Sequence, residues 1–161
     1  MKKTVAYSRS ILSQVMLIDK ANSIGNIHGG EIVKMMDSAA AVVAKKHSRS
    51  AVVTARIDQL EFHTPANVGD LITCTAELVF VGKSSMEVLV TVEVENLRVE
   101  KPAKVALKGY FTMVAIDKDG HALPVPELVL ETPEEKLEFE EGKERYKEYK
   151  LNQQKKKIHI E

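Results

Sequence analysis

The sequence predicts an α+β fold in which a curved antiparallel sheet wraps around one long central helix. Two observations carry this prediction. Residues 31–47 are apolar nearly all round and rich in alanine and methionine, which favours a helix without a wide polar face. Several long segments alternate between apolar and polar residues, which is typical of strands with one buried face. Because only the strands are available to cover such a helix, a layered arrangement follows.

Five segments have the properties of strands. A Gly-Lys-Ser sequence at 82–84 separates two clearly alternating segments, which predicts a tight hairpin. Thr64-Pro65 ends one candidate strand, and the sequence Asp-Lys-Asp-Gly at 117–120 ends another. The predicted strands are residues 8–18, 52–62, 71–80, 86–95 and 103–116.

The last 31 residues differ in charge from the rest of the chain, since 131–161 hold 17 charged groups and the first 130 residues hold 29. Acidic residues come first and basic residues last, as a helix dipole favours. We therefore divide the chain into a domain at 1–130 and a charged C-terminal helix and tail at 131–161. Thr132 is the expected N-cap, Pro133 the first helical residue, and Gln153 the approximate end. This helix is either a solvated surface element or a binder of an anionic ligand.

Length and composition argue against several classes of protein. The 161 residues fit one domain, and 23 basic against 23 acidic residues leave no surplus of positive charge for nucleic acid. The longest apolar run, 39–44, is far shorter than the roughly 20 residues that cross a bilayer, and we expect neither a secretory signal nor membrane association. The single cysteine, Cys74, fits a reducing cytoplasm. The five histidines lack the spacing of metal ligands, so we expect no metal site.

Asp37 lies within the apolar helix, among methionines and alanines. A buried carboxylate without a partner is costly or becomes protonated. Two interpretations stay open: the carboxylate faces an edge or pairs with a local group, or it is held in a dry pocket as a general base or nucleophile.

A glycine-rich segment precedes this helix. Gly29 and Gly30 leave backbone N–H groups accessible at the helix start, where the dipole favours a developing negative oxygen; alternatively they only turn the chain. Asn26 bonds a water or a carbonyl, or caps the helix. His28 is a candidate base, although a lone loop histidine is usually solvated. Since Asp37 lies about 12 Å along the helix from Gly29, one substrate meets both groups only if a second copy supplies the helix start. The sequence therefore predicts a homodimer with composite sites.

Three ordered segments carry a resemblance to a known family. They are GNIHGGEIVKMMD at 25–37, FHTPANVGD at 62–70 and GKSSMEV at 82–88, and the tail has EEGKERY at 140–146. In this order they resemble the hotdog-fold acyl-CoA thioesterases, in particular the branch of cytosolic acyl-CoA hydrolases. The resemblance covers about residues 8–150.

The resemblance implies hydrolysis of fatty acyl-CoA to a carboxylic acid and coenzyme A, within lipid metabolism. Asp37 would activate the water or attack the thioester, and Asn26 of the facing subunit would position the water or the substrate. A backbone N–H near Gly29 or Gly30 would hold the oxyanion. Coenzyme A is then part of the substrate and a product, and no separate cofactor is expected. The family also implies that the homodimer assembles further as a trimer of dimers, a hexamer.

The phosphates of coenzyme A need a basic or amide-rich surface. Lys83, Ser84 and Ser85 at the hairpin tip are the first candidates, and Arg56 and His28 are further ones. The alternatives are that the tip is an ordinary polar turn and that Arg56 pairs with an acidic residue.

Two other functions stay open. A hotdog dehydratase or hydratase would pair His28 with an acid, but its usual His-Phe-Pro-Gly loop is absent from this sequence. A non-catalytic acyl-CoA-binding module is the second alternative, and the presence of both Asn26 and Asp37 argues against it.

Overall fold

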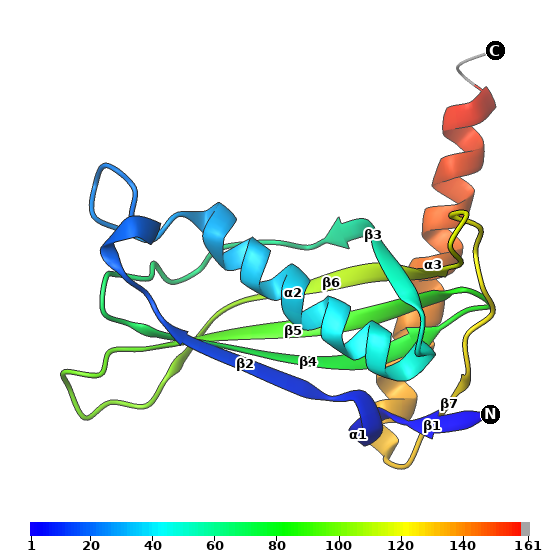
Figure 1. The fold of residues 1–161 in the computed structure, drawn as a ribbon, viewed down its shortest axis with the longest axis horizontal. Coiled ribbons are helices and arrows are strands. Elements are labelled where there is room, and N and C mark those ends of the chain that lie inside the picture. Colours follow the sequence, from blue (N-terminus) through cyan, green and yellow to red (C-terminus); the bar gives the residue numbers. More distant parts are fainter. Residues whose placement is uncertain (159–161) are drawn as a thin grey trace.

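The structure, a computed structural model, describes residues 1–158 and confirms the α+β class. Five antiparallel strands form one sheet in the order β2-β4-β5-β6-β3, and helix α2 crosses one face of it (Figure 1). The main strands are β2 (Ser10–Val15), β3 (Ala51–Asp58), β4 (Leu71–Val81), β5 (Ser85–Glu95) and β6 (Lys104–Ile116). The helices are α1 (Val5–Ser8), α2 (Gly29–Ser48) and α3 (Pro133–Ile158), with a 3-10 turn, η1, at Ile18–Lys20.

Strand alternation builds the core, as the sequence predicts. The inward side chains of β4 and β5 are fully or almost fully buried, and they form one apolar cluster with α2. These residues are Ile72, Cys74, Ala76, Leu78, Met86, Val88, Val90 and Val92. Burial also raises the pKa of the Cys74 thiol to about 11, so this cysteine stays protonated at neutral pH.

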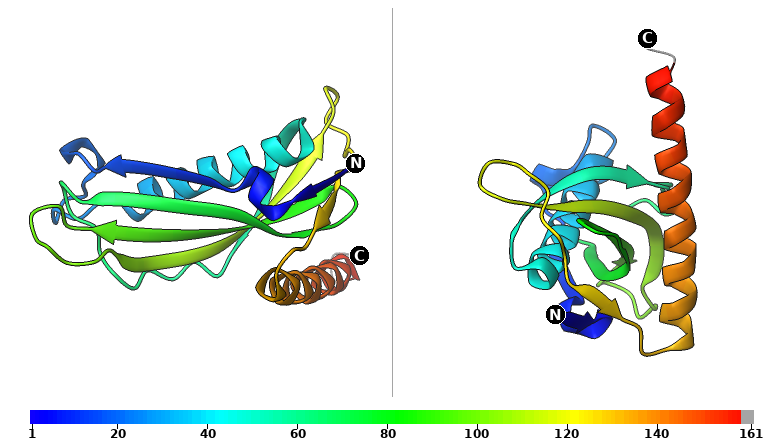
Figure 2. Two further views of the ribbon diagram at one scale, coloured as in Figure 1. Left: turned by 90° about the horizontal axis from the view of Figure 1, so that it is seen from below. Right: turned by 90° about the vertical axis from the view of Figure 1, so that its right-hand side faces the viewer.

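The sheet curves around helix α2, as the sequence predicts, and in the single chain it covers one side of the helix (Figure 2). Its buried side chains are Ile32, Met36, Ala39, Ala40, Val43, Ala44 and His47. Val42 keeps 38% of its surface exposed, and Asp37 and Met35 are half-buried. The apolar residues on the uncovered side of α2 therefore face outward.

Two predicted strand boundaries are wrong for local reasons, and two short strands were not predicted. The first strand is shorter than 8–18 because α1 precedes it and η1 follows it. The strand at 52–62 ends at Asp58, since Gln59 has a φ of 60° and leaves the extended conformation. The predictions did not include β1 (Lys2–Thr4) and β7 (Glu127–Val129), which pair in parallel and are too short to show a period.

Helix α3 lies on the opposite face of the sheet from α2 (Figure 2). Its N-cap is confirmed, because the Thr132 hydroxyl oxygen accepts a hydrogen bond of 3.1 Å from the Glu135 N–H. Most of its residues are exposed, as expected for a solvated surface helix, but one side of it packs on the sheet. Phe80 packs against Phe139 and Tyr146, with ring centroids 5.0 and 5.5 Å apart, respectively.

A glycine permits the close approach of α3 to the sheet. A Cβ at position 142 would lie 2.7 Å from the Cβ of Phe80, so Gly142 leaves the space that the contact needs. Among residues 1–158, no helix has the length and apolar character needed to cross a membrane.

Candidate functional site

Asp37 lies on α2 where the helix passes the edge strand β3. The Thr54 hydroxyl on β3 donates a hydrogen bond of 2.6 Å to Asp37 Oδ1. The carboxylate is half-buried in the single chain rather than enclosed in a dry pocket. Val53 and Ile57 on β3 keep 45% and 39% of their surfaces exposed. An acid thus lies beside an apolar, unpaired sheet edge, which is the kind of surface that proteins usually cover.

Helix α2 begins at Gly29, two residues before the predicted start at residue 31. Within the described part of the chain, the N–H groups of Gly29 and Gly30 have no hydrogen-bond acceptor outside the helix. A Cβ on Gly29 would lie 3.2 Å from the ring of Phe62, whereas the space around Gly30 is open. The exposed His28 is the N-cap residue, but its side chain makes no capping bond. The free amides are suited to an oxyanion.

The loop before α2 contains two half-buried asparagines. The Asn22 side-chain oxygen accepts hydrogen bonds of 3.1 Å from the N–H groups of Ile24 and Asn26, and so closes the loop. Asn26 does not cap the helix, because His28 occupies the cap, and its backbone bridges to Asn67. In residues 1–158 the side chain of Asn26 forms no hydrogen bond. Its amide is therefore free for another group.

A cavity of about 300 Å³ opens on the outer face of the sheet, between the β4–β5 hairpin and α3. It brings together two predictions made from separate segments, since Lys83, Ser84 and Ser85 line it together with Arg56. The sequence left open that the C-terminal helix binds an anionic ligand, but it did not indicate which of its residues would line a cavity. The helix adds Arg145, Tyr146, Tyr149, Lys150 and Gln153 to the lining.

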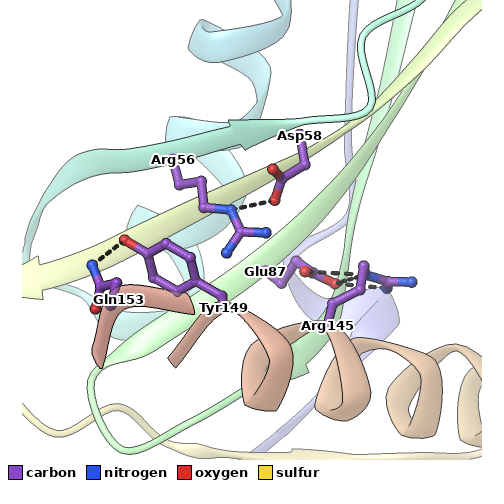
Figure 3. A network of polar contacts seen from close by, with 6 residues as sticks. All are labelled: Arg56, Asp58, Glu87, Arg145, Tyr149 and Gln153. Atoms are coloured by element: carbon purple, nitrogen blue, oxygen red, sulfur yellow. Dashed lines mark hydrogen bonds and ion pairs between the residues drawn. The ribbon is translucent and has the colours of Figure 1, made fainter. Parts of the chain in front are cut away.

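Two of the four cations at this cavity already have partners (Figure 3). Arg56 Nε lies 2.6 Å from the Asp58 carboxylate, and its guanidinium carbon lies 3.9 Å from the centroid of the Tyr149 ring. This is the ion pair that the sequence left open as an alternative. Arg145 donates to both carboxylate oxygens of Glu87, at 2.7 Å for the shortest bond. Burial raises the pKa of Glu87, and the bonds from Arg145 act against that rise.

The turn after β6 gathers Asp117, Asp119 and His121, whose ligand atoms lie within 4.8 Å of one another. The spacing of the histidines in the sequence did not indicate this group. Asp117 Oδ1 accepts hydrogen bonds from the N–H groups of Asp119 at 2.8 Å and His121 at 2.9 Å. Both bonds hold the pKa of the Asp117 carboxyl below its usual value, and the bond from the His121 N–H has the largest effect. The carboxylate therefore serves to close the turn.

The chain is similar to known proteins over most of its length. A family model described as the thioesterase superfamily matches residues 24–101. A Zymomonas mobilis protein named as an uncharacterized acyl-CoA thioester hydrolase is 41% identical over 65% of this chain and 70% of its own. The chain belongs to the thioesterase superfamily. Human cytosolic acyl coenzyme A thioester hydrolase is 37% identical over 94% of this chain, which spans only 40% of that relative's length.

Solved thioesterases share the fold. A hexameric acyl-CoA thioesterase is 36% identical, with a TM-score of 0.88 over 94% of this chain and 96% of its own. An acyl-CoA hydrolase from Staphylococcus aureus, in complex with butyryl coenzyme A and coenzyme A, is 28% identical, with a TM-score of 0.88 over 99% and 97%. The structure therefore has the hotdog fold, which confirms the resemblance.

Alanine variants of the Staphylococcus aureus hydrolase replace one aspartate, one asparagine and one threonine. In that protein the asparagine lies 15 positions before the aspartate, and the threonine lies 17 positions after it. Sequence reasoning missed Asn22 and Thr54, which stand at the same spacings from Asp37 in this thioesterase superfamily member. Asn22 closes its loop with two hydrogen bonds, but these are visible only in the structure, and no local sequence pattern marks Thr54.

Proposed function

We propose that this chain is an acyl-CoA thioester hydrolase that releases a fatty acid and coenzyme A, with Asp37 as its catalytic carboxylate. The observation that carries the proposal is the placement of Asp37 beside Thr54, at an open edge of a hotdog fold. The spacing of this pair equals that of the varied aspartate and threonine in the Staphylococcus aureus acyl-CoA hydrolase. The names of the human and Zymomonas mobilis relatives support the same substrate class.

The reaction needs few groups. Asp37 accepts a proton from water while the water oxygen attacks the thioester carbonyl carbon, or its carboxylate attacks that carbon directly. The N–H groups of Gly29 or Gly30 stabilise the oxyanion that forms. The C–S bond then breaks, and the thiolate of coenzyme A takes up a proton. In the route of direct attack this step leaves a mixed anhydride on Asp37, and water then hydrolyses the anhydride to release the fatty acid and restore the carboxylate. Coenzyme A is substrate and product in this scheme, and we propose no separate cofactor.

Two asparagines are candidates for the residue that positions water or substrate. Asn26 has a free side-chain amide, whereas Asn22 stands at the spacing of the varied asparagine in the Staphylococcus aureus hydrolase. Asn26→Ala and Asn22→Ala form a matched pair of variants. The residue that positions water or substrate is the one whose replacement lowers kcat without unfolding the loop, as measured by circular dichroism and thiol release.

We propose that the site is completed by a second copy of the chain. Asp37 and Gly29 lie about 12 Å apart along one helix, so a single α2 cannot bring both groups to one carbonyl. Val42 on α2 and Val53 and Ile57 on the edge strand β3 are exposed in the single chain and would be buried if this edge formed the homodimer interface. Hexameric relatives favour a trimer of such dimers. Mixing Asn26→Ala with Asp37→Ala subunits should restore part of the activity, and no recovery after proven subunit exchange would contradict shared sites.

The phosphates of coenzyme A are assigned to the hairpin tip, where Lys83 extends from the rim of the outer cavity and Ser84 and Ser85 line it. Arg56 borders the same cavity but is already paired with Asp58, so we expect it to act mainly through packing. His28 is exposed at the helix start, where it remains a second-rank candidate for contact with coenzyme A. We propose a cytoplasmic location, as the names of the mammalian relatives suggest.

Thiol release from a series of acyl-CoA substrates of increasing chain length tests the proposal. Release that depends on Asp37 is the expected result. Turnover of 2-enoyl or 3-hydroxyacyl thioesters without free thiol would instead identify a dehydratase or hydratase. Binding of acyl-CoA without any release, at high protein concentration, would identify a non-catalytic module.

A further inference from the structure

The charges around the outer cavity are not balanced. Arg56 is neutralised by Asp58, and Arg145 is neutralised by Glu87. Among the residues that the structure describes, no carboxylate oxygen lies within 4.0 Å of the amino group of Lys83 or Lys150. One of these lysines comes from the hairpin and the other from α3, so two unpaired positive charges border the cavity.

Aromatic rings form another part of the same lining. Phe80 and Tyr146 pack together with centroids 5.5 Å apart, and the Lys150 amino group lies 5.4 Å from the centroid of the Tyr146 ring. Tyr149 is fixed by Arg56 on its ring and by a 2.6 Å hydrogen bond from Gln153 to its hydroxyl (Figure 3). Rings that are held in place beside free cations suit a ligand that has both a flat base and phosphate groups.

The cavity and the catalytic carboxylate adjoin the same short piece of β3. Thr54 bonds Asp37 on the inner face, while Ala55 and Arg56 line the cavity on the outer face. An elongated substrate with its reacting carbonyl at one end and its phosphates at the other therefore has a chemically matched surface for each end.

We propose that α3 forms one wall of the binding site for the nucleotide end of coenzyme A, with Lys150 on a phosphate and Tyr146 beside the adenine. This inference rests on the proposed function and deepens it, because it makes α3 a determinant of substrate specificity. Acyl thioesters that carry the nucleotide gain the contacts of α3. Acyl thioesters of short thiols gain none of them.

The test compares two thioesters of the same acyl group, acyl-CoA and acyl-N-acetylcysteamine, which lacks the nucleotide. Lys150→Ala should lower kcat/KM about ten-fold for acyl-CoA through KM, the scale of one charge-assisted hydrogen bond, and leave it at the parent value for the short thioester. Lys150→Arg should restore most of the loss. Lys147→Ala is the matched control, since Lys147 lies one turn away on α3 and does not line the cavity.

Direct binding gives a readout that does not depend on catalysis. Adenosine 3′,5′-bisphosphate, measured by calorimetry, should bind the parent protein and bind Lys150→Ala and Tyr146→Leu about ten-fold more weakly. Equal effects of Lys150→Ala on both thioesters, or equal binding of the bisphosphate by parent and variant, would overturn the inference. If the parent hydrolyses neither thioester, the proposed function fails, and the calorimetry still decides the nucleotide site.

Discussion

The two long helices lie on opposite faces of one sheet and are held there in different ways. Helix α2 buries an apolar side against the concave face, and its residues join the main core. Helix α3 is polar for most of its length and is attached to the outer face through Phe139, Gly142, Arg145 and Tyr146. In the proposed function, the face that holds α2 carries the reacting groups, whereas the face that holds α3 recognises the substrate.

The largest expected effect concerns the inner face. Asp37→Ala should lower kcat by about 10² to 10⁴-fold and leave KM nearly unchanged, because the lost group acts in the transition state. Asp37→Asn should behave in the same way although it keeps the size of the side chain. Thiol release measures both, and Ser38→Ala, an exposed neighbour on α2, is the control. A parent rate in purified Asp37→Ala would remove this residue from the site.

The next effect concerns the attachment of α3. Arg145→Met leaves the Glu87 carboxylate buried without its cation, so we expect the free energy of unfolding to fall by about 3 kcal/mol. The double variant Glu87→Leu/Arg145→Met should regain part of this loss, because both charges are gone. Urea unfolding measures the change, and Lys147→Met is the control, since its pair with Glu144 is exposed. A double variant no more stable than the single one would contradict a charge-based attachment.

A smaller effect separates the hydroxyl of Thr54 from its size. Thr54→Val removes the hydrogen bond to Asp37 and should lower kcat about ten-fold, whereas Thr54→Ser keeps the donor and should stay near the parent rate. The measurement is thiol release at saturating acyl-CoA. The opposite pattern, a parent rate in Thr54→Val and a loss in Thr54→Ser, would mean that the size of the side chain, rather than its hydrogen bond, is what matters at this position.

The smallest effect lies at the far end of α2. Burial lowers the pKa of His47, whose Nε2 lies 2.8 Å from the Pro126 carbonyl oxygen. Below about pH 6.5 the unfolded state therefore binds more protons than the folded state, and the free energy of unfolding falls as pH decreases, by at most about 1.4 kcal/mol per pH unit. Above about pH 6.5 the contribution of His47 to the free energy of unfolding no longer changes with pH.

His47→Gln can keep a donor to Pro126 and does not titrate, so its stability should depend less on pH between about 7 and 5. Urea midpoints across this range give the comparison. His63→Gln, which replaces an exposed histidine, is the control for the loss of one histidine. Parallel curves for the parent and His47→Gln would mean that burial of this ring does not influence acid stability.

The same comparison explains how far the sequence could predict the molecule. The period of two in β4 and β5 and the apolar composition of α2 report burial directly, so the class, the main strands and the inner helix were predictable. Helix α3 has no such period, because its contacts depend on two rings, a glycine and one ion pair with strands far away in the sequence. The contacts of α3 with the outer face of the sheet could therefore not be predicted from the sequence.

The candidate site shows the same division. Asp37 was placed correctly within α2, because an acid in an apolar helix is locally conspicuous, whereas Gly29 and Gly30 were expected just before the helix and form its first residues. Thr54 was missed because its hydrogen bond to Asp37 depends on where β3 meets α2, which no local pattern records. The outer cavity is lined by segments that are distant in the sequence. Candidate residues in single segments could be predicted, but the cavity that the segments form together could not.

A single extra residue in β3 decides which side chains face which helix. The pairing of β3 with β6 shifts between Thr54 and Arg56, so that Thr54 stands opposite Met113 and Arg56 opposite Thr112, and Ala55 is left over as a bulge. In an uninterrupted ladder Arg56 would stand opposite Phe111 and point its guanidinium into the core. Because of Ala55, Thr54 points toward Asp37 on the inner face of the sheet while Arg56 points toward the charged cavity on the outer face.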